Sequence, residues 1–237
     1  MERVVTPEHM DDPAIDREEL RLSLAYIRGV NRRLGGTAAL LRLLKRWSRH
    51  WPRDRPVTLL DIGTGSSDIP LAARAWAERA GYDLRITGVD LHPTTIDLAR
   101  EHVGGRAGIE LVQADARRLT DRYKPEAFDY VHAGMFLHHL PFVEVLTVLR
   151  IMDGLARAGI VWNDLVRSRV SLAALRILLI GKPEFVRYDA TVSVRAGFTK
   201  REALDHARRV GIGYARWRRT MWYRFTLAGE KPGAWRP

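Results

Sequence analysis

The fold of this chain is decided by the stretch Val57-Thr-Leu-Leu-Asp-Ile-Gly-Thr-Gly-Ser-Ser-Asp68, in which an apolar run closes on a turn containing glycine. The run over 57–62 is apolar throughout most of its length, as in strands buried on both faces of a parallel sheet. Gly63 and Gly65 follow directly and let the backbone turn sharply. A helix is expected over 69–80. The stretch therefore predicts a strand, turn and helix, with the turn at the carboxyl edge of a sheet, where α/β proteins bind ligands.

The same alternation continues along the chain. It predicts further strands over 84–90, 109–115, 128–132 and 159–163, and helices over 93–102, 143–155, 171–180 and 200–210. Helices between successive strands give right-handed crossovers and a parallel sheet covered on both faces. Two closing strands, 214–218 and 223–227, are separated by too few residues for a crossover helix and should pair antiparallel. The sequence thus predicts a doubly wound α/β fold.

Two amphipathic helices precede this domain, over 16–29 and 37–50, with Gly35-Gly36 between them. Residues 1–53 are therefore expected to form an N-terminal helical cap, and residues 54–237 a Rossmann-like domain. The segment near 165–195 is expected to be an insertion that covers the substrate.

Composition restricts the chemistry. The chain has 237 residues, of which 46% are hydrophobic, and it contains no cysteine. This excludes disulfides, thiol catalysis and thiolate zinc sites, so catalysis must use histidines, carboxylates, hydroxyls or a bound cofactor. The longest apolar stretch, 172–180, is interrupted by Arg176 and is too short to span a bilayer. A cytoplasmic, soluble protein without a transmembrane segment is expected.

The net charge of +11 is distributed unevenly. Residues 54–164 carry 12 basic and 16 acidic side chains, whereas residues 195–237 carry 11 basic and 3 acidic ones. This arrangement suits an acidic core that holds a cationic cofactor, with basic flanks that meet an anionic or membrane-associated substrate. Solvated arginines on an ordinary surface are the alternative interpretation.

Carboxylates around the glycine turn indicate which ligand it binds. A dinucleotide fingerprint requires Gly or Ala at position 68, where this chain has Asp68, and Asp61 comes just before the turn. Two carboxylates would repel a pyrophosphate but attract a ligand with ammonium and sulfonium charges. Asp90 ends the second strand, where an acid in this topology binds the ribose hydroxyls. Asp115 ends the third strand, within reach of an adenine amino group.

These segments resemble class I S-adenosylmethionine-dependent methyltransferases over residues 57–165, through Asp61-Ile-Gly-Thr-Gly65, Gly88-Val-Asp90, Gln113-Ala-Asp115, Phe128-Asp-Tyr-Val131 and Leu137-His-His-Leu140. The resemblance implies S-adenosylmethionine as cofactor and the sheet order 3-2-1-4-5-7-6, with strand seven antiparallel. It also implies that the cofactor is bound by Asp61, Gly63, Gly65, Asp90, Leu91, Asp115 and Ala116. Ser67 departs from the pattern, since many members have another glycine there.

The histidine pair is similar to the segment of ubiquinone- and menaquinone-type methyltransferases that lies beside the cofactor. Either His138 or His139 is a candidate general base; the alternative is that one packs against the cofactor or a helix and the other is exposed.

Short segments over 26–36, 162–167 and 193–199 resemble small bacterial methyltransferases that act on phenolic or quinone-like polyketide products. Asn163 and Asp164 end the fifth strand and could orient a hydroxyl or accept its proton. Arg167 and Arg195 could hold a phenolate or carboxylate. In the alternative reading Asp164 caps the next helix and both arginines pair with it.

The expected function is therefore O-methylation of a small phenolic or quinol-like aromatic acceptor in secondary metabolism, with His138, His139 or Asp164 as base. No metal is expected. The Asn163-Asp164 pair is similar to that of metal-dependent catechol-type enzymes, but strand four ends in Val131-His-Ala133, which offers no third oxygen ligand for magnesium.

Two other functions remain open. An RNA methyltransferase would explain the mixture of cations and aromatics over 201–224, although the Asn/Asp-Pro-Pro-aromatic motif is missing after strand four and argues against nucleic acid. A non-catalytic cofactor-binding or membrane-surface module would use the helix around 172–180 and the basic flanks. No feature of the sequence predicts the oligomeric state.

Overall fold

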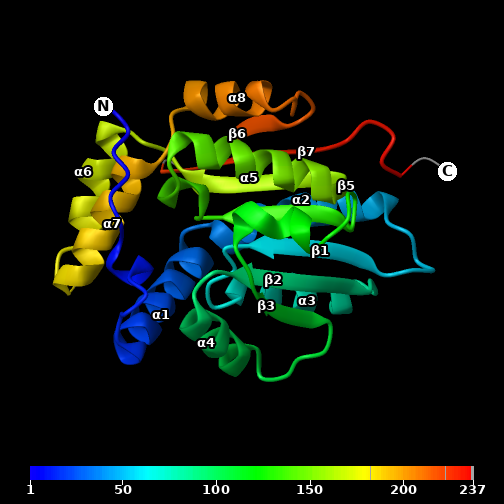
Figure 1. The fold of residues 1–237 in the computed structure, drawn as a ribbon, viewed down its shortest axis with the longest axis horizontal. Helices are drawn as coiled ribbons and strands as arrows, with labels where there is room; N and C mark the ends of the chain where they lie inside the picture. The colour runs from blue at the N-terminus through cyan, green and yellow to red at the C-terminus, as the bar shows by residue number, and fades with distance from the viewer. Residues whose placement is uncertain (182, 222, 236–237) are drawn as a thin grey trace.

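A computed structural model describes residues 1–181, 183–221 and 223–235, and its centre is a seven-stranded sheet in the order β3-β2-β1-β4-β5-β7-β6 (Figure 1). β7 pairs antiparallel with both β5 and β6, while the other neighbours are parallel. This confirms the predicted order and the antiparallel closing pair. The strands are β1 (Val57–Ile62), β2 (Leu84–Asp90), β3 (Ile109–Gln113), β4 (Phe128–Gly134), β5 (Ala156–Leu165), β6 (Arg216–Met221) and β7 (Arg224–Glu230).

Helices surround this sheet, and one of them was not predicted. They are α1 (Arg17–Arg33), α2 (Gly36–Trp47), α3 (Asp68–Arg79), α4 (Pro93–Val103), α5 (Phe142–Leu155), α6 (Arg169–Leu178), α7 (Glu184–Ala196) and α8 (Lys200–Arg209). Short 3-10 turns are η1 (His9–Asp11), η2 (Ser48–His50), η3 (Ala116–Asp121) and η4 (Leu137–His139). The unpredicted helix is α7, whose β-branched residues have low intrinsic helix propensity. Its apolar side is instead stabilised by tertiary packing.

The core has one apolar layer on each face of the sheet. Alternate residues of a strand point to opposite faces, so Leu60 and Ile62 of β1 join the layer under α5 and α8, while Val57 and Leu59 join the layer under α2 and α3. In the second layer the ring of Trp47 stacks on Tyr130, with centroids 5.1 Å apart. α2 therefore belongs to the main core, although it lies within the segment 1–53 expected to form a cap.

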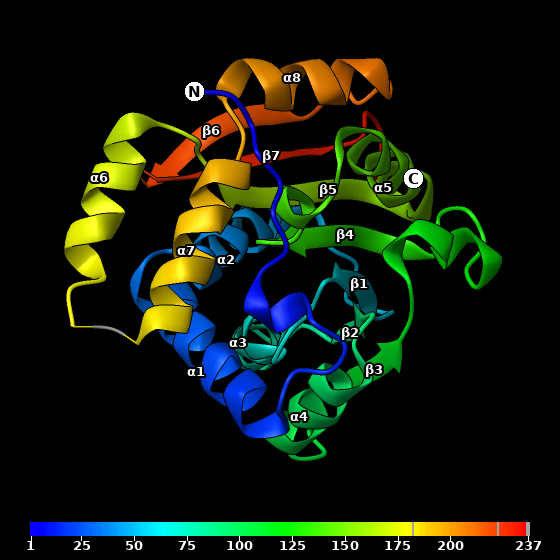
Figure 2. The same cartoon turned by 60° about the vertical axis from the view of Figure 1, so that its left-hand side comes forward.

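Residues 1–12 run beside α7, which lies next to α6 (Figures 1 and 2). Arg3 fastens this segment, since its guanidinium donates to the carbonyl oxygens of Ala196 at 2.7 Å, His138 at 3.1 Å and Leu140 at 2.8 Å. The N-terminal segment thus connects α7 with the turn η4 that follows β4.

α6 presents an apolar surface outward, with Val170 and Ile177 each 70% exposed and Ile180 just beyond it 77% exposed. Within the described residues, no helix is both long and apolar enough to cross a lipid bilayer. Contact of α6 with a membrane surface stays a prediction.

Candidate active site

A cavity of about 1000 Å³ lies where the carboxyl ends of β1, β2 and β4 meet α1, α6, α7 and the N-terminal segment. It extends from the glycine turn after β1 to the turn η4. Apolar side chains such as Leu24, Val30 and Leu175 line much of it. Ligand sites commonly have volumes of about 300–1000 Å³, so this cavity lies at the upper end of that range.

The glycine turn brings the backbone close to the cavity. Gly63 has φ +66°, and a Cβ placed on it would lie 2.7 Å from the ring of Phe136. Gly65 has φ +52°. Ser67, which departs from the family pattern, takes the same left-handed conformation with φ 56°, and its Oγ lies 2.8 Å from Thr64 Oγ1. The serine therefore reproduces the backbone shape that a glycine would give, with a hydrogen bond holding its side chain.

Asp90 holds this turn in place. Its carboxylate accepts the Gly65 N–H at 3.1 Å and the His92 N–H at 3.1 Å. Burial raises the pKa of Asp90 and outweighs these two hydrogen bonds. Leu91, the next residue, is 59% exposed and also lines the cavity.

Asp61 lies deeper and has a partner that the sequence did not reveal. One carboxylate oxygen of Asp61 accepts a hydrogen bond from Thr64 Oγ1 at 2.8 Å, and the other lies 2.5 Å from Nδ1 of His132. The two residues are in register on β1 and β4, so knowledge of the strand pairing would have found the contact. His132 is fully buried, lines the cavity, and its Nε2 has no partner among the described residues.

Two further acids line the cavity. Asp68 accepts Asn31 Nδ2 at 3.3 Å, and burial raises the pKa of its carboxyl. Asp115 is the N-cap of η3 and forms an ion pair with Arg117 at 2.7 Å. Ala116 follows it and is buried at the wall of the cavity. All seven residues expected to bind the cofactor therefore line one cavity, and its floor is acidic.

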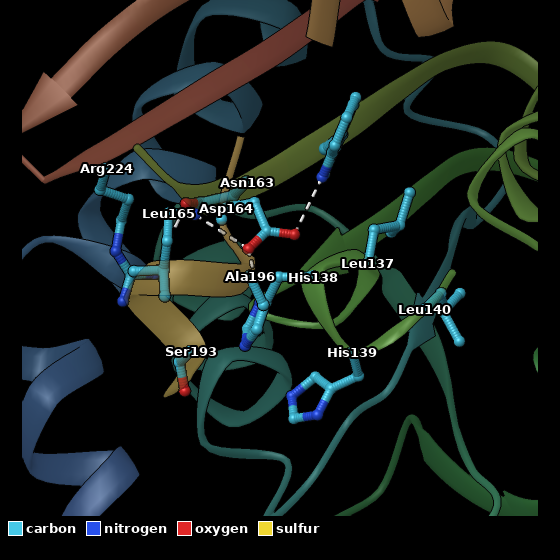
Figure 3. Close-up of polar contacts among 12 residues, drawn as sticks. Leu137, His138, His139, Leu140, Asn163, Asp164, Leu165, Ser193, Ala196 and Arg224 are labelled. Carbon is cyan, nitrogen blue, oxygen red and sulfur yellow. Dashed lines mark hydrogen bonds and ion pairs between the residues drawn. The ribbon is translucent and has the colours of Figure 1, made fainter. Parts of the chain in front are cut away.

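His138 and His139 lie at the other end of the cavity, with their ring centroids 4.3 Å apart (Figure 3). Nδ1 of His138 lies 2.6 Å from Asp164 Oδ1, and Nδ1 of His139 lies 3.0 Å from Asp11 Oδ2. Both Nε2 atoms face the same oxygen of Glu8, at 3.4 Å and 3.8 Å. Burial disfavours a charged ring, but the carboxylates of Glu8 and Asp11 outweigh it and raise the pKa of His139 to about 10.

Glu8 and Asp11 were missed by sequence reasoning. Asp11 and His139 are 128 residues apart in the chain, and no motif joins η1 to η4. The Glu8 side chain is 7% exposed and lines the cavity, which only the folded chain reveals. Ser193 of α7 also donates its hydroxyl to Glu8.

The expectation that Asp164 contacts the acceptor is corrected. Its side chain is fully buried and does not line the cavity. Besides its contact with His138, the Asp164 carboxylate accepts hydrogen bonds from Trp162 Nε1 at 3.0 Å and from the Leu165 N–H at 2.9 Å. It does not cap the next helix, because Ser168 does so. The carboxylate therefore holds the ring of His138 on the side away from Glu8 and does not line the cavity.

The expectation that Asn163, Arg167 and Arg195 hold the acceptor is also corrected, because none of the three lines the cavity. Asn163 is fully buried and links Gly36 O, at 3.4 Å, to Arg224. Arg167 is 5% exposed and pairs with Glu202, not with Asp164. Arg195 is exposed on α7 and does not line the cavity.

The basic aromatic segment near the C-terminus is used for packing where the structure describes it. Trp217 stacks on Phe225 with centroids 6.0 Å apart, and Tyr223 donates its hydroxyl to the carbonyl of Leu34. Trp222 lies outside the described residues. The described aromatics therefore do not form an open stacking platform for bases.

Comparisons with known proteins agree on the type of domain. Residues 59–159 match a family described as a methyltransferase domain. A demethylmenaquinone methyltransferase of Staphylococcus haemolyticus is 27% identical over 119 residues, which cover 48% of this chain and 47% of that protein. The chain thus spans about half the length of the curated relatives it matches.

Two solved structures share the fold. A SAM-dependent methyltransferase from Aquifex aeolicus has a TM-score of 0.61 at 14% identity, covering 91% of this chain and 98% of that one. A plantazolicin methyltransferase, solved with a triazolic desmethyl analogue and S-adenosylhomocysteine, has a TM-score of 0.62 at 16% identity, covering 85% and 79%. At these identities the likeness concerns the fold.

Proposed function

We propose that this protein, a class I S-adenosylmethionine-dependent methyltransferase, transfers the methyl group of its cofactor to an oxygen of a small aromatic acceptor. The observation that carries the proposal is the single cavity that joins the acidic glycine turn to His138 and His139. One end suits a cationic nucleoside, and the other offers proton acceptors beside apolar walls.

The cofactor is proposed to lie along the carboxyl ends of β1 and β2. Its ammonium and sulfonium charges are attracted by Asp61 and Asp68, which line this end of the cavity. Asp90 suits the ribose hydroxyls because it already orients the backbone of Gly65. Asp115 and Ala116 are the expected contacts of the adenine.

The acceptor is proposed to lie between this cofactor and η4, with its hydroxyl toward the cluster of Glu8, His138 and His139. The acceptor oxygen forms a bond to the methyl carbon while the carbon–sulfur bond breaks, and the sulfur leaves with the bonding electrons as S-adenosylhomocysteine. The hydroxyl proton passes to Nε2 of His138, whose ring Asp164 orients through Nδ1. Alignment of the two reactants supplies most of the remaining rate.

Two features support a flat, largely apolar acceptor. Leu175 and Val186 from α6 and α7, together with Val30 from α1, give the acceptor end hydrophobic walls. A curated relative is named demethylmenaquinone methyltransferase, which favours a quinol-like ring as the acceptor. An acceptor from secondary metabolism, related to polyketide phenols, belongs to this chemical class.

The test is a methyl-transfer assay with labelled S-adenosylmethionine and a panel of phenols and quinols, matched to their aniline and thiophenol analogues. We expect label in the ether product of at least one hydroxyl compound and binding of S-adenosylhomocysteine by calorimetry. Binding of S-adenosylhomocysteine with label entering only amines, thiols, carbon or RNA would contradict the proposed acceptor. Absence of any heat with S-adenosylhomocysteine would contradict the cofactor as well.

A further inference from the structure

Three side chains at the acceptor end converge in the geometry of a metal-binding site. His138, His139 and Glu8 each offer one ligand atom, and the three atoms lie within 4.8 Å of one another. Ligand atoms bound to one tetrahedral ion at about 2.0–2.2 Å are about 3.3–3.6 Å apart. Nε2 of His138 is 3.4 Å from Glu8, within this range, and Nε2 of His139, at 3.8 Å, needs only a small movement to reach it.

The carboxylates that contact the two histidine rings favour the same role. Asp164 accepts from Nδ1 of His138, and Asp11 accepts from Nδ1 of His139. Metal-binding histidines typically donate their remaining ring N–H to a carboxylate, which fixes the ring and leaves the other nitrogen's lone pair free for the ion. Here both rings have such a partner, and both free nitrogens point to Glu8.

Three carboxylates surround the two imidazole rings. Glu8, Asp11 and Asp164 contact them, and the side chains of His138, Asp164 and Glu8 are almost completely buried. Buried carboxylates require pairing with opposite charge. A divalent ion bound to the two Nε2 atoms would supply this charge in place of ring protons and would replace contacts at 3.4–3.8 Å with direct bonds.

We propose that Glu8, His138 and His139 bind one divalent transition-metal ion at the acceptor end of the cavity. Two imidazole nitrogens and one carboxylate suit Zn²⁺, Fe²⁺ or Mn²⁺ and leave at least one coordination position open toward the cavity. An acceptor hydroxyl entering that position would release its proton to solvent water more easily, because the ion stabilises the oxyanion and takes the place of the histidine nitrogen that otherwise accepts the proton. Only this last role rests on the proposed function; the binding of the ion does not.

The site is tested by metal binding alone, without cofactor or acceptor. Protein lacking any histidine tag is stripped with EDTA, dialysed and titrated with Zn²⁺ by calorimetry, and with Co²⁺ by visible absorption. The chain contains no cysteine, so a Co²⁺ spectrum reports only nitrogen and oxygen ligands. We expect one ion per chain and the intense visible bands of four- or five-coordinate cobalt.

Variants separate this site from surface binding. Glu8→Gln and His139→Ala should each weaken Zn²⁺ binding at least about tenfold. Asp11→Asn should weaken it by about 10- to 100-fold, because the carboxylate that orients the ring of His139 is lost. His50→Ala removes an exposed histidine far from the cavity and should leave the affinity unchanged. Thermal melting without metal checks that each variant folds.

Two results would overturn the proposal. One is a wild-type Co²⁺ spectrum that matches hydrated, six-coordinate cobalt. The other is a wild-type Zn²⁺ affinity equal to that of folded Glu8→Gln. Because neither measurement involves methyl transfer, a failure here leaves the proposed function standing, and an inactive protein that binds one ion leaves the metal site standing.

Discussion

Nδ1 of His138 lies 2.6 Å from Oδ1 of Asp164, and this contact joins the turn after β4 to the end of β5. Asp164 does not line the cavity, whereas His138 does. The role we propose for the carboxylate is therefore to orient one imidazole ring, and its removal should change turnover without changing cofactor binding.

Asp164→Asn is expected to lower kcat by about 10²-fold, within the range for a misplaced proton-transfer group, while the Kd for S-adenosylhomocysteine changes less than about threefold. Steady-state kinetics and calorimetry measure the two effects. In a double-mutant cycle, Asp164→Asn should add little to His138→Asn, because both act through the same ring. Additive losses would show that Asp164 has a separate, structural effect.

Gly63→Ala is expected to weaken both folding and cofactor binding. The left-handed conformation costs a non-glycine residue roughly 1–2 kcal/mol, and the new Cβ would lie 2.7 Å from Phe136. Gly104→Ala is the matched control, because Gly104 has φ +61° but nothing within 4 Å of its Cβ position. Melting temperature should fall in both variants, further in Gly63→Ala, and only Gly63→Ala should lose affinity for S-adenosylhomocysteine. Equal behaviour of the two variants would mean that the contact with Phe136 has no effect.

Asp90→Asn is expected to raise the Kd for S-adenosylhomocysteine by about 10- to 100-fold, the equivalent of one lost hydrogen bond to a charged group. The variant keeps the size of the side chain but removes its negative charge. It should therefore accept weaker hydrogen bonds from the N–H groups of Gly65 and His92 and from the ribose hydroxyls. Asp97→Asn, which alters an exposed ion pair with Arg100 on α4, serves as control and should bind normally. A Kd for Asp90→Asn within a factor of two of wild type would remove this residue from the cofactor site.

The elements of the sheet could be predicted because their signals are local. Val57 to Ile62 and the turn after it specify a strand and a ligand loop without reference to any distant residue. The seven residues expected to bind the cofactor lie at or near strand ends, and the fold brings them together along one cavity. Prediction of the acceptor end was poorer, since Glu8 and Asp11 reach the histidines only through tertiary packing.

Position at a strand end was misleading for Asn163 and Asp164. Successive residues of a strand point to opposite faces, and β5 is central, between β4 and β7, so both side chains are enclosed by neighbouring elements. Arg167 was misjudged for a related reason: Glu202 on α8, which binds it, is 35 residues further along the chain. Such partners become visible only when the packing of α7 and α8 is known.

The acid stability of the fold should depend on Asp129, which accepts from Arg55 at 3.1 Å, Thr58 N–H at 2.9 Å and Arg157 at 2.7 Å. Burial alone would raise the pKa of Asp129, but these donors outweigh it and lower the pKa. A lowered pKa in the folded state contributes stability above the unfolded value of about 4, and this contribution is lost as the pH falls through the folded pKa.

Asp129→Asn should therefore reduce the free energy of unfolding at pH 7 and lessen its decline at acid pH. Urea unfolding at steps from neutral pH downward measures both effects. Asp121→Asn, at an exposed ion pair with Arg118, is the control and should follow the wild-type curve. A gap between wild type and Asp129→Asn that stays constant down to about pH 3 would contradict the ionic origin of the effect.

The segment of residues 1–12 lies outside the matched methyltransferase domain, yet its residues Val5, Glu8 and Asp11 line the cavity, and Arg3 fastens it to the carbonyls of His138 and Leu140. Residues 1–12 can therefore change during evolution without altering the end of the cavity proposed to bind the cofactor, which is built from the carboxyl ends of the strands. Two proteins that share this domain could differ in reactivity through this short stretch alone. Exchanging it between homologues offers a compact route to redesigning which molecules are methylated.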